Sequence, residues 1–365
     1  MKFTCTQENL SRGLNAVGRV ASKNLALPIL NNVLIVAEGG VVKLQATNLE
    51  LGTTTIVRAK IDQPGRYTVP AKLLGDFVNF LGHEQIHCQA KENGLTIVSG
   101  HSTTTIRGIS AEEFPVMPTI TSPTTVTLPA RELATGLEGV VFAVANDESR
   151  PEISGVFIRA QDKKLVLAAT DSYRLAERRL DLLQGEQNHA GVIVPARTAQ
   201  ELLRVLPQSE AEVKIAIGDN QIQINFDELE LVSRIIEGHY PDYEQIIPKT
   251  WATTIVVDHQ EFLANTKAAS LFCQPGINDL TLEADEKQLA LSAANSQQGE
   301  HRATLSAKVT GPKTTTVFNY RYLLDGIQGL AGDEIQLQLN DGQAPGLLQN
   351  MKQVGALYLI MPIRQ

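Results

Sequence analysis

Two short stretches of the chain carry residue types that could perform hydrolysis. Residues 83–87 read HEQIH, and two histidines four residues apart on a helix can share a zinc ion while the glutamate acts as a general base. Asp171 and Ser172 place a carboxylate beside a hydroxyl, and these are two of the three groups of a serine-hydrolase triad. A hydrolase that uses either stretch is therefore one hypothesis for this chain.

The pattern around the histidines argues against the zinc site. Gly82 stands where the preceding helix should end, a position that favours glycine. The segment from Ile86 to Ala90 then alternates apolar and polar residues, as a strand does. Four residues of a strand span about 13 Å, so His83 and His87 could not bind one ion. We expect neither a metal nor a cofactor.

Other enzyme motifs are missing from the sequence. It contains no GxSxG elbow, no Walker loop and no GxGxxG opening a helix. Nothing ties a particular histidine to Asp171 and Ser172. We therefore expect a non-catalytic protein and keep the hydrolase as the alternative.

Residues 165–179, LVLAATDSYRLAERR, favour a binding role instead. An apolar run typical of a buried strand leads into the polar residues 170–172, which favour a turn. Tyr173, Arg174 and Leu175 follow. One interpretation packs the aromatic and aliphatic side chains on the core. The other places the trio at the rim of a binding pocket, because Tyr and Arg are enriched where binding energy concentrates.

The chain repeats one pattern three times. Each copy pairs a short β-rich run with an amphipathic helix, in YTVPAKLLGDFVNFLG (67–82), VIVPARTAQELLRVLP (192–207) and TVFNYRYLLDGIQGLA (316–331). Apolar residues in these helices recur at spacings of three and four, which predicts one shared face. In the first copy this face contains Leu73, Leu74, Phe77 and Leu81.

A second helix precedes each of these, and strand-like runs lie between them. The upstream helices fall within residues 1–21, 126–145 and 254–272. Two Pro-bearing stretches, 112–125 and 237–250, mark the seams between copies. We predict an α+β fold of three tandem domains, each a doubled strand-helix-strands half with two helices and two antiparallel sheets. The predicted domains are residues 1–121, 122–249 and 250–365.

The second helix of every copy begins with a cation. Lys72, Arg197 and Arg321 occupy equivalent positions, and an acidic residue follows each of them four positions later. A cation in a first helical turn opposes the helix dipole, so a contact outside the helix is one interpretation. A solvated face with ion pairs between residues i and i+4 is the other.

Composition narrows the class of protein. The 365 residues include 43% apolar residues and carry a net charge of −8. This negative charge argues against a conventional high-affinity nucleic-acid binder. The sequence has no apolar run long enough to span a membrane and no secretory signal at its start. Its three cysteines are far apart, which fits a reducing compartment. We expect a cytoplasmic protein.

Several separated motifs resemble one family. They are MKFT at the start, LPILNNVLI (27–35), TVPA (68–71), ATDSYRLA (169–176), VIVPAR (192–197), YPDYEQIIP (240–248) and YLIMPIRQ (358–365). In this order they are similar to the bacterial sliding clamps, the β subunits of DNA polymerase III. The resemblance runs from Met1 to Gln365, and it implies a ring-shaped head-to-tail homodimer with helices inside and sheets outside.

The resemblance also implies function and partners. Such a ring encircles duplex DNA without sequence specificity and tethers the replicative polymerase for processive replication. Replicative and translesion polymerases, the clamp loader and repair proteins would dock through short hydrophobic peptides. A protein scaffold without a role on DNA remains a further hypothesis.

By the same resemblance, one hydrophobic pocket between the second and third domains receives the peptides. The matching positions are Ile153, Thr170, Ser172, Tyr173, Arg174, Leu175, Pro241, Ile246, Leu359, Met361, Pro362 and Ile363. The family often has Gly-His where this chain has Ser172-Tyr173, which predicts a shifted peptide preference. Only the middle copy of the repeat contains the Tyr-Arg-Leu trio, and this favours the pocket over core packing.

The resemblance assigns two further sets of residues. The candidate DNA contacts are Lys23, Asn24, Lys72, Arg150, Arg197 and Arg321. The candidate dimer interface pairs an edge strand of the first domain with one of the third domain in the partner. It contains Thr104, Ile106, Leu271, Phe272 and Glu300.

Overall fold

A computed structural model describes residues 1–21, 25–120, 123–147, 149–185, 190–352 and 355–364. The chain divides into two compact units. The N-terminal unit contains Met1–Arg131 and Arg204–Ile235, and the C-terminal unit contains Glu132–Leu203 and Ile236–Gln365. The described helices and strands follow the order strand, helix, strands, strand, helix, strands in each third of the chain, as the sequence predicts.

The six α-helices of the described residues fall in pairs, one pair in each third. They are α1 (Gln7–Val17), α2 (Ala71–Phe80), α3 (Ala130–Glu138), α4 (Ala196–Val205), α5 (His259–Ser270) and α6 (Tyr320–Gly329). Polar side chains define several helix starts. Thr6 accepts a hydrogen bond from the Asn9 N–H, and Asp258 accepts one from the Glu261 N–H. Such N-caps satisfy donors that the first helical turn leaves free.

The strands of the first third are β1 (Lys2–Thr6), β2 (Asn32–Glu38), β3 (Val41–Thr47), β4 (Leu51–Arg58), β5 (Lys60–Gln63), β6 (Gly65–Pro70), β7 (Gln85–Lys91), β8 (Gly94–Ser99) and β9 (Ser102–Ile106). Those of the second are β10 (Thr124–Pro129), β11 (Gly155–Gln161), β12 (Lys164–Thr170), β13 (Arg174–Asp181), β14 (Gln184–Gly185), β15 (Val192–Pro195), β16 (Glu212–Ile217), β17 (Gln221–Phe226) and β18 (Leu229–Arg234). Those of the third are β19 (Thr253–Asp258), β20 (Asp279–Asp285), β21 (Gln288–Asn295), β22 (Gly299–Thr310), β23 (Thr314–Asn319), β24 (Glu334–Leu339), β25 (Gly346–Gln349) and β26 (Ala356–Ile360).

Antiparallel sheets run through the joints between repeats. In the N-terminal unit β4 pairs with β18, and we call this joint the first seam. In the C-terminal unit β13 pairs with β26, and we call this joint the second seam. The C-terminal unit therefore contains one continuous sheet in the order β15-β11-β12-β13-β26-β25-β24-β19-β22-β21-β20-β23.

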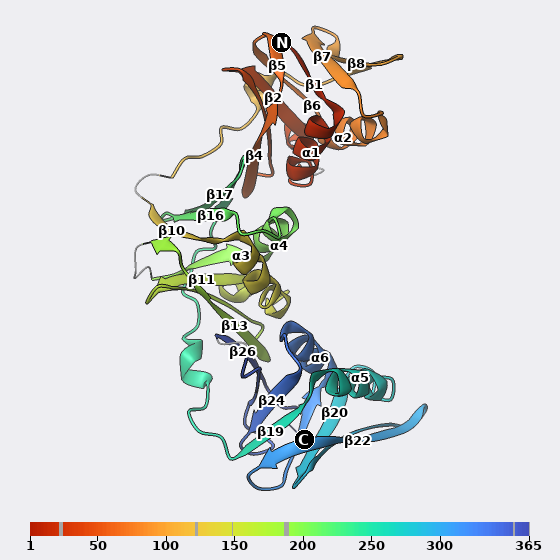
Figure 1. The fold of residues 1–365 in the computed structure, drawn as a ribbon, viewed down its shortest axis with the longest axis vertical. Helices are drawn as coiled ribbons and strands as arrows, with labels where there is room; N and C mark the ends of the chain where they lie inside the picture. Colours follow the sequence, from red (N-terminus) through yellow and green to blue (C-terminus); the bar gives the residue numbers. More distant parts are fainter. Residues whose placement is uncertain (22–24, 121–122, 148, 186–189, 353–354, 365) are drawn as a thin grey trace. The chain divides into compact units, whose positions relative to one another are not determined.

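Helices cover one face of the sheets in each unit. Figure 1 shows α1 beside α2 and α5 beside α6, and both pairs are in contact. Gly13 on α1 lies so close to Val57 on β4 that a Cβ there would come within 2.6 Å of the valine methyl. Gly326 lets α6 approach the Tyr358 ring in the same way. These close approaches hold each helix firmly against its sheet.

Two expectations about the first repeat have different outcomes. The HEQIH segment runs into β7, so His87 lies on a strand as predicted. The predicted apolar face of α2 is partly wrong, because Leu74 is buried whereas Leu73, predicted on the same face, is 53% exposed. Val78, which the prediction leaves out of this face, is buried, and Phe80 is 89% exposed. The spacing contains two apolar stripes, and only one of them faces the sheet. No helix among the described residues is long and apolar enough to cross a membrane.

Candidate functional site

The C-terminal unit brings together residues predicted to form the peptide pocket. Leu175 on β13 pairs with Leu359 on β26. Beyond this pair, the Met361 N–H donates a hydrogen bond of 2.8 Å to the Tyr173 carbonyl oxygen. The turn between β12 and β13 therefore lies against the segment that follows β26.

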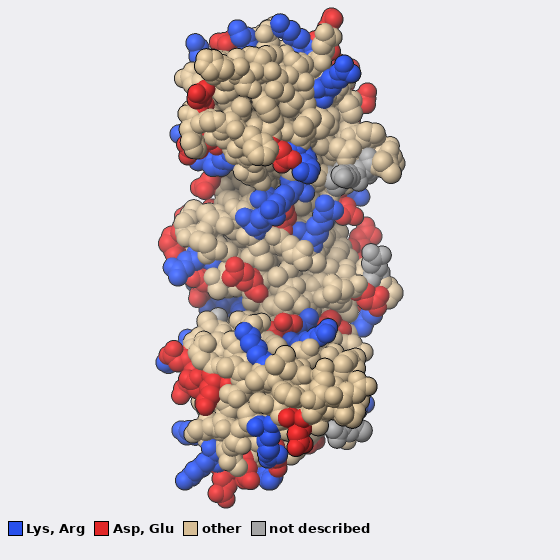
Figure 2. Space-filling model, turned by 90° about the vertical axis from the view of Figure 1, so that its right-hand side faces the viewer, with Lys and Arg blue, Asp and Glu red and all other residues tan. Residues whose placement is uncertain are grey.

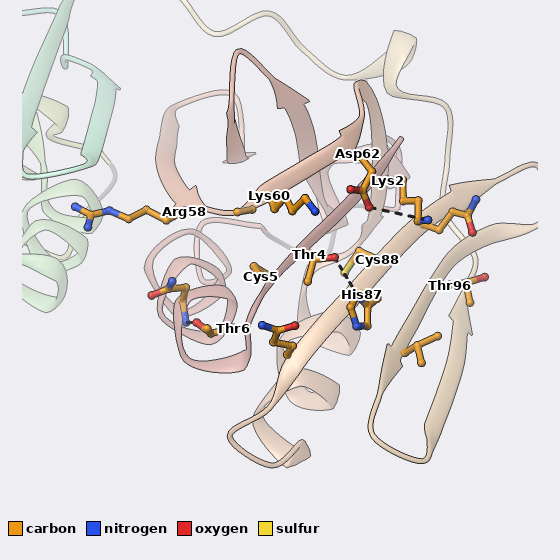
Figure 3. Close-up of a pocket in the computed structure, with 15 residues that line it drawn as sticks. Lys2, Thr4, Cys5, Thr6, Arg58, Lys60, Asp62, His87, Cys88 and Thr96 are labelled. Atoms are coloured by element: carbon orange, nitrogen blue, oxygen red, sulfur yellow. Dashed lines mark hydrogen bonds and ion pairs between the residues drawn. The ribbon is translucent and has the colours of Figure 1, made fainter.

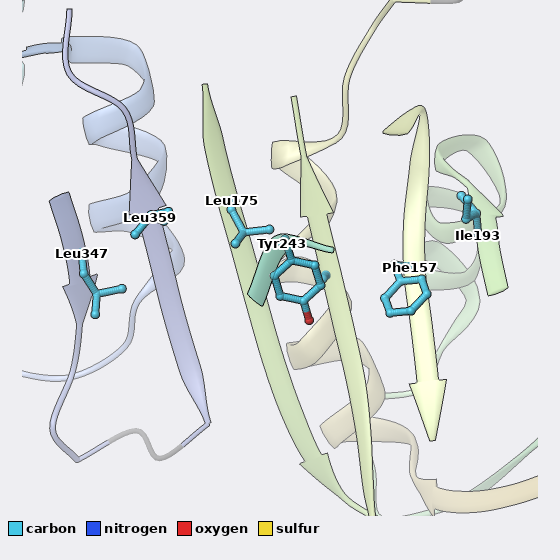
Figure 4. Close-up of a cluster of buried hydrophobic side chains, with 7 residues drawn as sticks. Phe157, Leu175, Ile193, Tyr243, Leu347 and Leu359 are labelled. Carbon is cyan, nitrogen blue, oxygen red and sulfur yellow. The ribbon is translucent and has the colours of Figure 1, made fainter. Parts of the chain in front are cut away.

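The Tyr-Arg-Leu trio divides between core and surface. Leu175 is 1% exposed and packs in a cluster with Phe157, Tyr243 and Leu359 (Figure 4). Tyr173 is 62% exposed. Leu175 is therefore part of the core, whereas a ligand could reach the Tyr173 side chain.

Arg174 is held on several sides. Its Nε contacts Asp171 Oδ2 at 2.9 Å, and its Nη1 forms an ion pair with Asp325 on α6. Nη2 donates to the Phe142 carbonyl oxygen at 2.7 Å. The guanidinium also lies 4.5 Å from the centroid of the Tyr322 ring, close enough for a cation–π contact.

The Arg174 network supports the exposed tyrosine. Tyr322 stacks on Tyr173 with ring centroids 6.3 Å apart. Burial lowers the pKa of Arg174, but Tyr358 and the carboxylates of Asp171 and Asp325 raise the pKa by more. Arg174 thus stays charged and fixes the wall behind Tyr173, instead of offering free donors to a ligand.

Hydrogen bonds and one left-handed residue shape the turn between β12 and β13. The Thr170 hydroxyl donates 2.6 Å to the Arg174 carbonyl oxygen. Ser172 has φ 78°, a left-handed conformation that costs a non-glycine residue energy. Arg150, predicted to contact DNA, donates from Nη1 to Ser172 Oγ at 2.7 Å. Ile153 is 1% exposed and lies in the core.

The linker after β18 is anchored beside this turn. The Tyr243 hydroxyl donates 2.5 Å to Glu177 Oε2. Burial raises the pKa of Tyr243, and the Glu177 carboxylate raises it further. The anchor leaves Pro241 and Ile246 exposed, the latter by 53%. Sequence reasoning missed Tyr243 and Glu177, although an acidic residue within an apolar strand is a signal of a buried partner.

The C-terminal segment contributes the last residues of the predicted peptide pocket. Pro362 is buried, whereas Met361 and Ile363 are half-buried. The Ile363 N–H donates 2.8 Å to the Val317 carbonyl oxygen. The predicted pocket residues that remain at least partly accessible are Ser172, Tyr173, Arg174, Pro241, Ile246, Met361 and Ile363.

The three cations at equivalent helix positions differ in their ion-pair partners. Lys72, Arg197 and Arg321 are each the second residue of their helix and are exposed. Lys72 pairs with Asp76, four residues later, at 2.7 Å. Within the described part of the chain neither Arg197 nor Arg321 has a carboxylate partner. Lys23 and Asn24 lie outside the described residues.

Three arginines line one cavity in the N-terminal unit. It has a volume of about 660 Å³, and Arg12, Arg58 and Arg204 come to it from α1, β4 and α4. Arg204 also donates 2.9 Å to the Ala16 carbonyl oxygen near the end of α1. Sequence reasoning missed this group because its members lie far apart in the chain. Lys and Arg are interspersed with Asp and Glu on the face that Figure 2 shows.

Three of the residues predicted for the dimer interface, Thr104, Ile106 and Glu300, lie on strands with an open edge. Strand β9, which contains Thr104 and Ile106, ends the sheet β5-β1-β7-β8-β9. Residues 299–306 of β22 pair with β21 on one side only, since β19 pairs with residues 307–310. Glu300 is exposed on this edge. Leu271 and Phe272 directly follow α5, and Leu271 is 70% exposed. Ile106 is 3% exposed, so its side chain packs inside its own unit.

The hydrolase hypothesis finds no support. His87 Nδ1 lies 2.9 Å from Thr4 Oγ1, at the wall of a cavity of about 890 Å³ that also contains Lys2, Lys60 and Asp62 (Figure 3). His83 does not line this cavity. Among the described residues, no group of three or more His, Cys, Asp or Glu side chains could hold a metal ion.

Comparisons with known proteins cover the whole chain. Models of the DNA polymerase III beta subunit match its N-terminal domain at residues 1–118, its central domain at 127–242 and its C-terminal domain at 244–364. A beta sliding clamp from Synechocystis sp. is 32% identical, with 100% of this chain and 99% of the relative covered. A beta sliding clamp from Haemophilus influenzae is 29% identical, with both chains fully covered.

Solved structures are similar over the same length. The DNA polymerase III subunit beta from Pseudomonas aeruginosa has a TM-score of 0.96 at 27% identity, and each chain is covered to 100%. A sliding clamp from Bartonella birtlesii bound to griselimycin has a TM-score of 0.95 at 30% identity, again with 100% of each chain covered.

Proposed function

The chain belongs to the family of DNA polymerase III beta subunits, and we propose from this that it is a DNA sliding clamp, a non-catalytic ring that tethers the replicative polymerase to duplex DNA. We place its three domains at residues 1–121, 122–249 and 250–365, and the protein in the cytoplasm. The observation that carries the proposal is the pattern of strand pairing at the seams.

The two seams use equivalent strands. In each, the third strand after a domain's first helix pairs with the last strand of the next domain, β4 with β18 and β13 with β26. The third domain offers residues 299–306 of β22 at the equivalent position, unpaired on one edge. The first domain offers its last strand, β9, also unpaired on one edge. A third seam therefore forms between β22 of one copy and β9 of another.

Such a joint is head to tail, because it uses different surfaces of the two copies. Two copies close the ring, which removes both exposed edges. The second apolar stripe of α2, Leu73, Phe77 and Phe80, then gains a partner, and we place Leu271 and Phe272 against it. Apolar side chains as exposed as Phe80 are a sign of an interface when they cluster.

Contacts to DNA come from the helices. Arg197 and Arg321 have no competing carboxylate within the described residues, so they are the stronger phosphate contacts, and Lys72 is the weaker one. We add Arg12 on α1 and Arg204 on α4, which line one cavity. Arg58 on β4 lines the same cavity but pairs with Glu228 at 3.3 Å, so it is a weaker contact. Few phosphate contacts and no reading of base edges allow a ring to slide.

The second seam is the peptide-docking site in this proposal. Tyr173, Ile246 and Met361 surround an accessible apolar area, and we propose that polymerases, the clamp loader and repair proteins insert short hydrophobic segments there. Apolar anchors at the centre of an interface typically carry most of its binding energy.

The decisive experiment is retention on DNA. The protein, loaded on nicked circular DNA by a clamp loader, should stay bound in high salt and leave when the circle is cut. Retention on short linear DNA with open ends would refute encirclement.

Ring closure is tested by removing one backbone donor. In an antiparallel hairpin with a two-residue loop, alternate residues point their N–H groups away from the partner strand, which places the Thr103 N–H on the open edge of β9. Thr103→Pro should convert dimer to monomer and abolish retention. Thr103→Val keeps the N–H and should remain a dimer.

A further inference from the structure

The first helix of each domain begins at an equivalent position with a different residue. Gln7 begins α1, Ala130 begins α3 and His259 begins α5. The backbone N–H of Gln7 donates 3.0 Å to the Glu84 carbonyl oxygen, which follows the second helix of the first domain. The backbone N–H of His259 donates 2.8 Å to the Asp333 carbonyl oxygen at the equivalent place in the third domain. The repeat therefore allows the two side chains to be compared directly.

Both side chains reach the neighbouring helix. Gln7 Nε2 donates 2.9 Å to the Val78 carbonyl oxygen near the end of α2. His259 Nε2 lies 3.0 Å from the Ile327 carbonyl oxygen near the end of α6. Gln7 is 7% exposed and His259 is 8% exposed. A neutral amide thus joins the helices of the first domain, and an imidazole joins α5 to α6, which lie side by side in Figure 1.

The imidazole makes a second contact. His259 Nδ1 lies 2.7 Å from the carbonyl oxygen of Gly332, in the segment between α6 and β24. A carbonyl oxygen only accepts hydrogen bonds, so both ring nitrogens must carry a proton for both bonds to form. A neutral imidazole has one N–H group and can donate to one carbonyl, whereas an imidazolium can donate to both.

The acidic side chains near His259 have other partners or face solvent. Asp258 Oδ1 accepts the Glu261 N–H at 2.8 Å, as the N-cap of α5. The Asp333 carboxylate contacts Lys352 at 3.5 Å, and Glu334 is exposed at the start of β24. Within the part of the chain that the structure describes, no carboxylate forms an ion pair with His259.

Other charged or titratable side chains come from β13 and β22. Arg178 on β13 donates to the carbonyl oxygen of Gly329, the last residue of α6. On β22, Lys308 is exposed, and His301 stacks on Phe272 beyond the far end of α5. The end of α6 therefore accepts hydrogen bonds from Arg178 and His259, and a helix C-terminus favours positive charge.

We propose that His259 is a buried imidazolium that locks α5 to α6, and that the loss of one proton opens this lock. A neutral ring leaves one nitrogen lone pair against a carbonyl oxygen, so the ring has to turn or water has to enter. The protonated ring stabilises the folded third domain with two hydrogen bonds, and the neutral ring with one. This stabilisation is therefore lost as the pH rises through the range in which histidine gives up its proton. The switch goes beyond the proposed clamp function and does not rest on ring closure.

Amide hydrogen exchange of the full-length protein at pH 5.5 and pH 8.5 tests the lock. The reporter is the N–H of residue 259, which is bonded to Asp333. After correction for intrinsic exchange, its opening constant in wild type should rise about tenfold with pH, because hydrogen bonds from charged groups are the strong ones. His259→Gln copies the side chain that the first domain uses, and it should show no such rise. The Gln7 N–H, bonded to Glu84, is the control within the same molecule.

Two results would overturn the proposal. One is the same change with pH in wild type and in His259→Gln. The other comes from NMR of wild type labelled with ¹⁵N, which is independent of any variant. Both ring N–H protons of His259 should exchange slowly with water at pH 5.5 and only one at pH 8.5, so a single slow proton at both pH values would contradict the lock. Retention of His259→Gln on nicked circular DNA separates this test from the clamp function.

Discussion

Arg174 on β13 is ion-paired with Asp325 on α6, 151 residues further along the chain. The pair joins the second domain to the third through a guanidinium that is 11% exposed. The turn before β13 already supplies Asp171 as a partner. Arg174 therefore holds the turn between β12 and β13, helix α6 and the Tyr173–Tyr322 stack in one arrangement. The geometry of the proposed peptide site thus follows from packing at the second seam.

Replacing Arg174 by Lys should destabilise the C-terminal unit by about 2 kcal/mol, because an ammonium cannot reproduce the forked contacts of a guanidinium. The loss is not larger because water can solvate the partly exposed Asp325 carboxylate. The measurement is the denaturant midpoint of unfolding. Arg321→Lys, on the same helix and exposed, is the matched control and should change the midpoint little. Equal midpoints for the two variants would contradict the role given to Arg174.

The two apolar members of the trio should separate stability from binding. Leu175→Ala should cost about 3 kcal/mol of unfolding free energy, as truncation of a buried leucine leaves a cavity. Tyr173→Ala should cost less than about 0.5 kcal/mol, as exposed positions do, and should weaken binding of a hydrophobic peptide at least fivefold. Thermal melts and peptide titrations measure the two effects. Unchanged peptide affinity in Tyr173→Ala would remove this side chain from the site.

Removal of one hydroxyl should loosen the linker. Tyr243→Phe deletes the 2.5 Å hydrogen bond to Glu177, a carboxylate that is 1% exposed. Hydrogen bonds to charged groups contribute about 1.5–3 kcal/mol, and the variant should lose stability in that range. Tyr240→Phe is the control, because the Tyr240 hydroxyl is buried and has no carboxylate partner in the described residues. A loss of stability that is as large in the control would show that the Glu177 bond is not the cause.

The three helix cations Lys72, Arg197 and Arg321 should differ in their effect on DNA binding. Each lost phosphate contact lowers the slope of log K against log salt by about 0.9. Arg197→Gln and Arg321→Gln should each lower the slope, whereas Lys72→Gln should lower it less, because Asp76 competes for Lys72. Asp76→Asn should in turn strengthen the Lys72 contact. Equal slopes for all three cation variants would show that the ion pair with Asp76 has no influence on DNA.

Periodicity predicted the repeated helices and strands because both signals are local. The side-chain roles at the second seam could not be predicted in this way. Leu175 and Tyr173 are two residues apart and equally suited to a core or a pocket, and only the pairing of β13 with β26 buries one of them. The apolar stripe of α2 was misassigned for the same reason, since Leu73 and Leu74 both fit the helical spacing but only Leu74 faces the sheet.

Two cysteines should make the protein sensitive to alkali. Burial raises the pKa of the Cys5 thiol from 9.0 to about 12 and raises the pKa of Cys88 well above its usual value. The folded state thus keeps the thiols protonated, while the unfolded chain ionises above pH 9. Ionisation of these thiols therefore leaves the free energy of unfolding unchanged below pH 9. The free energy of unfolding falls as the pH rises from 9 towards 12, because only the unfolded chain then loses these protons.

The urea midpoint should therefore fall between pH 8 and pH 10, and it should fall less in Cys5→Ala. At pH 8 a thiol reagent should label Cys5 and Cys88 only as fast as the protein unfolds, because thiolates are the reactive form and both side chains are buried. Chain unfolded in urea is the control for complete labelling. Rapid labelling of native protein, or the same pH dependence in wild type and Cys5→Ala, would show that these thiols do not titrate as the packing of β1 against β7 requires.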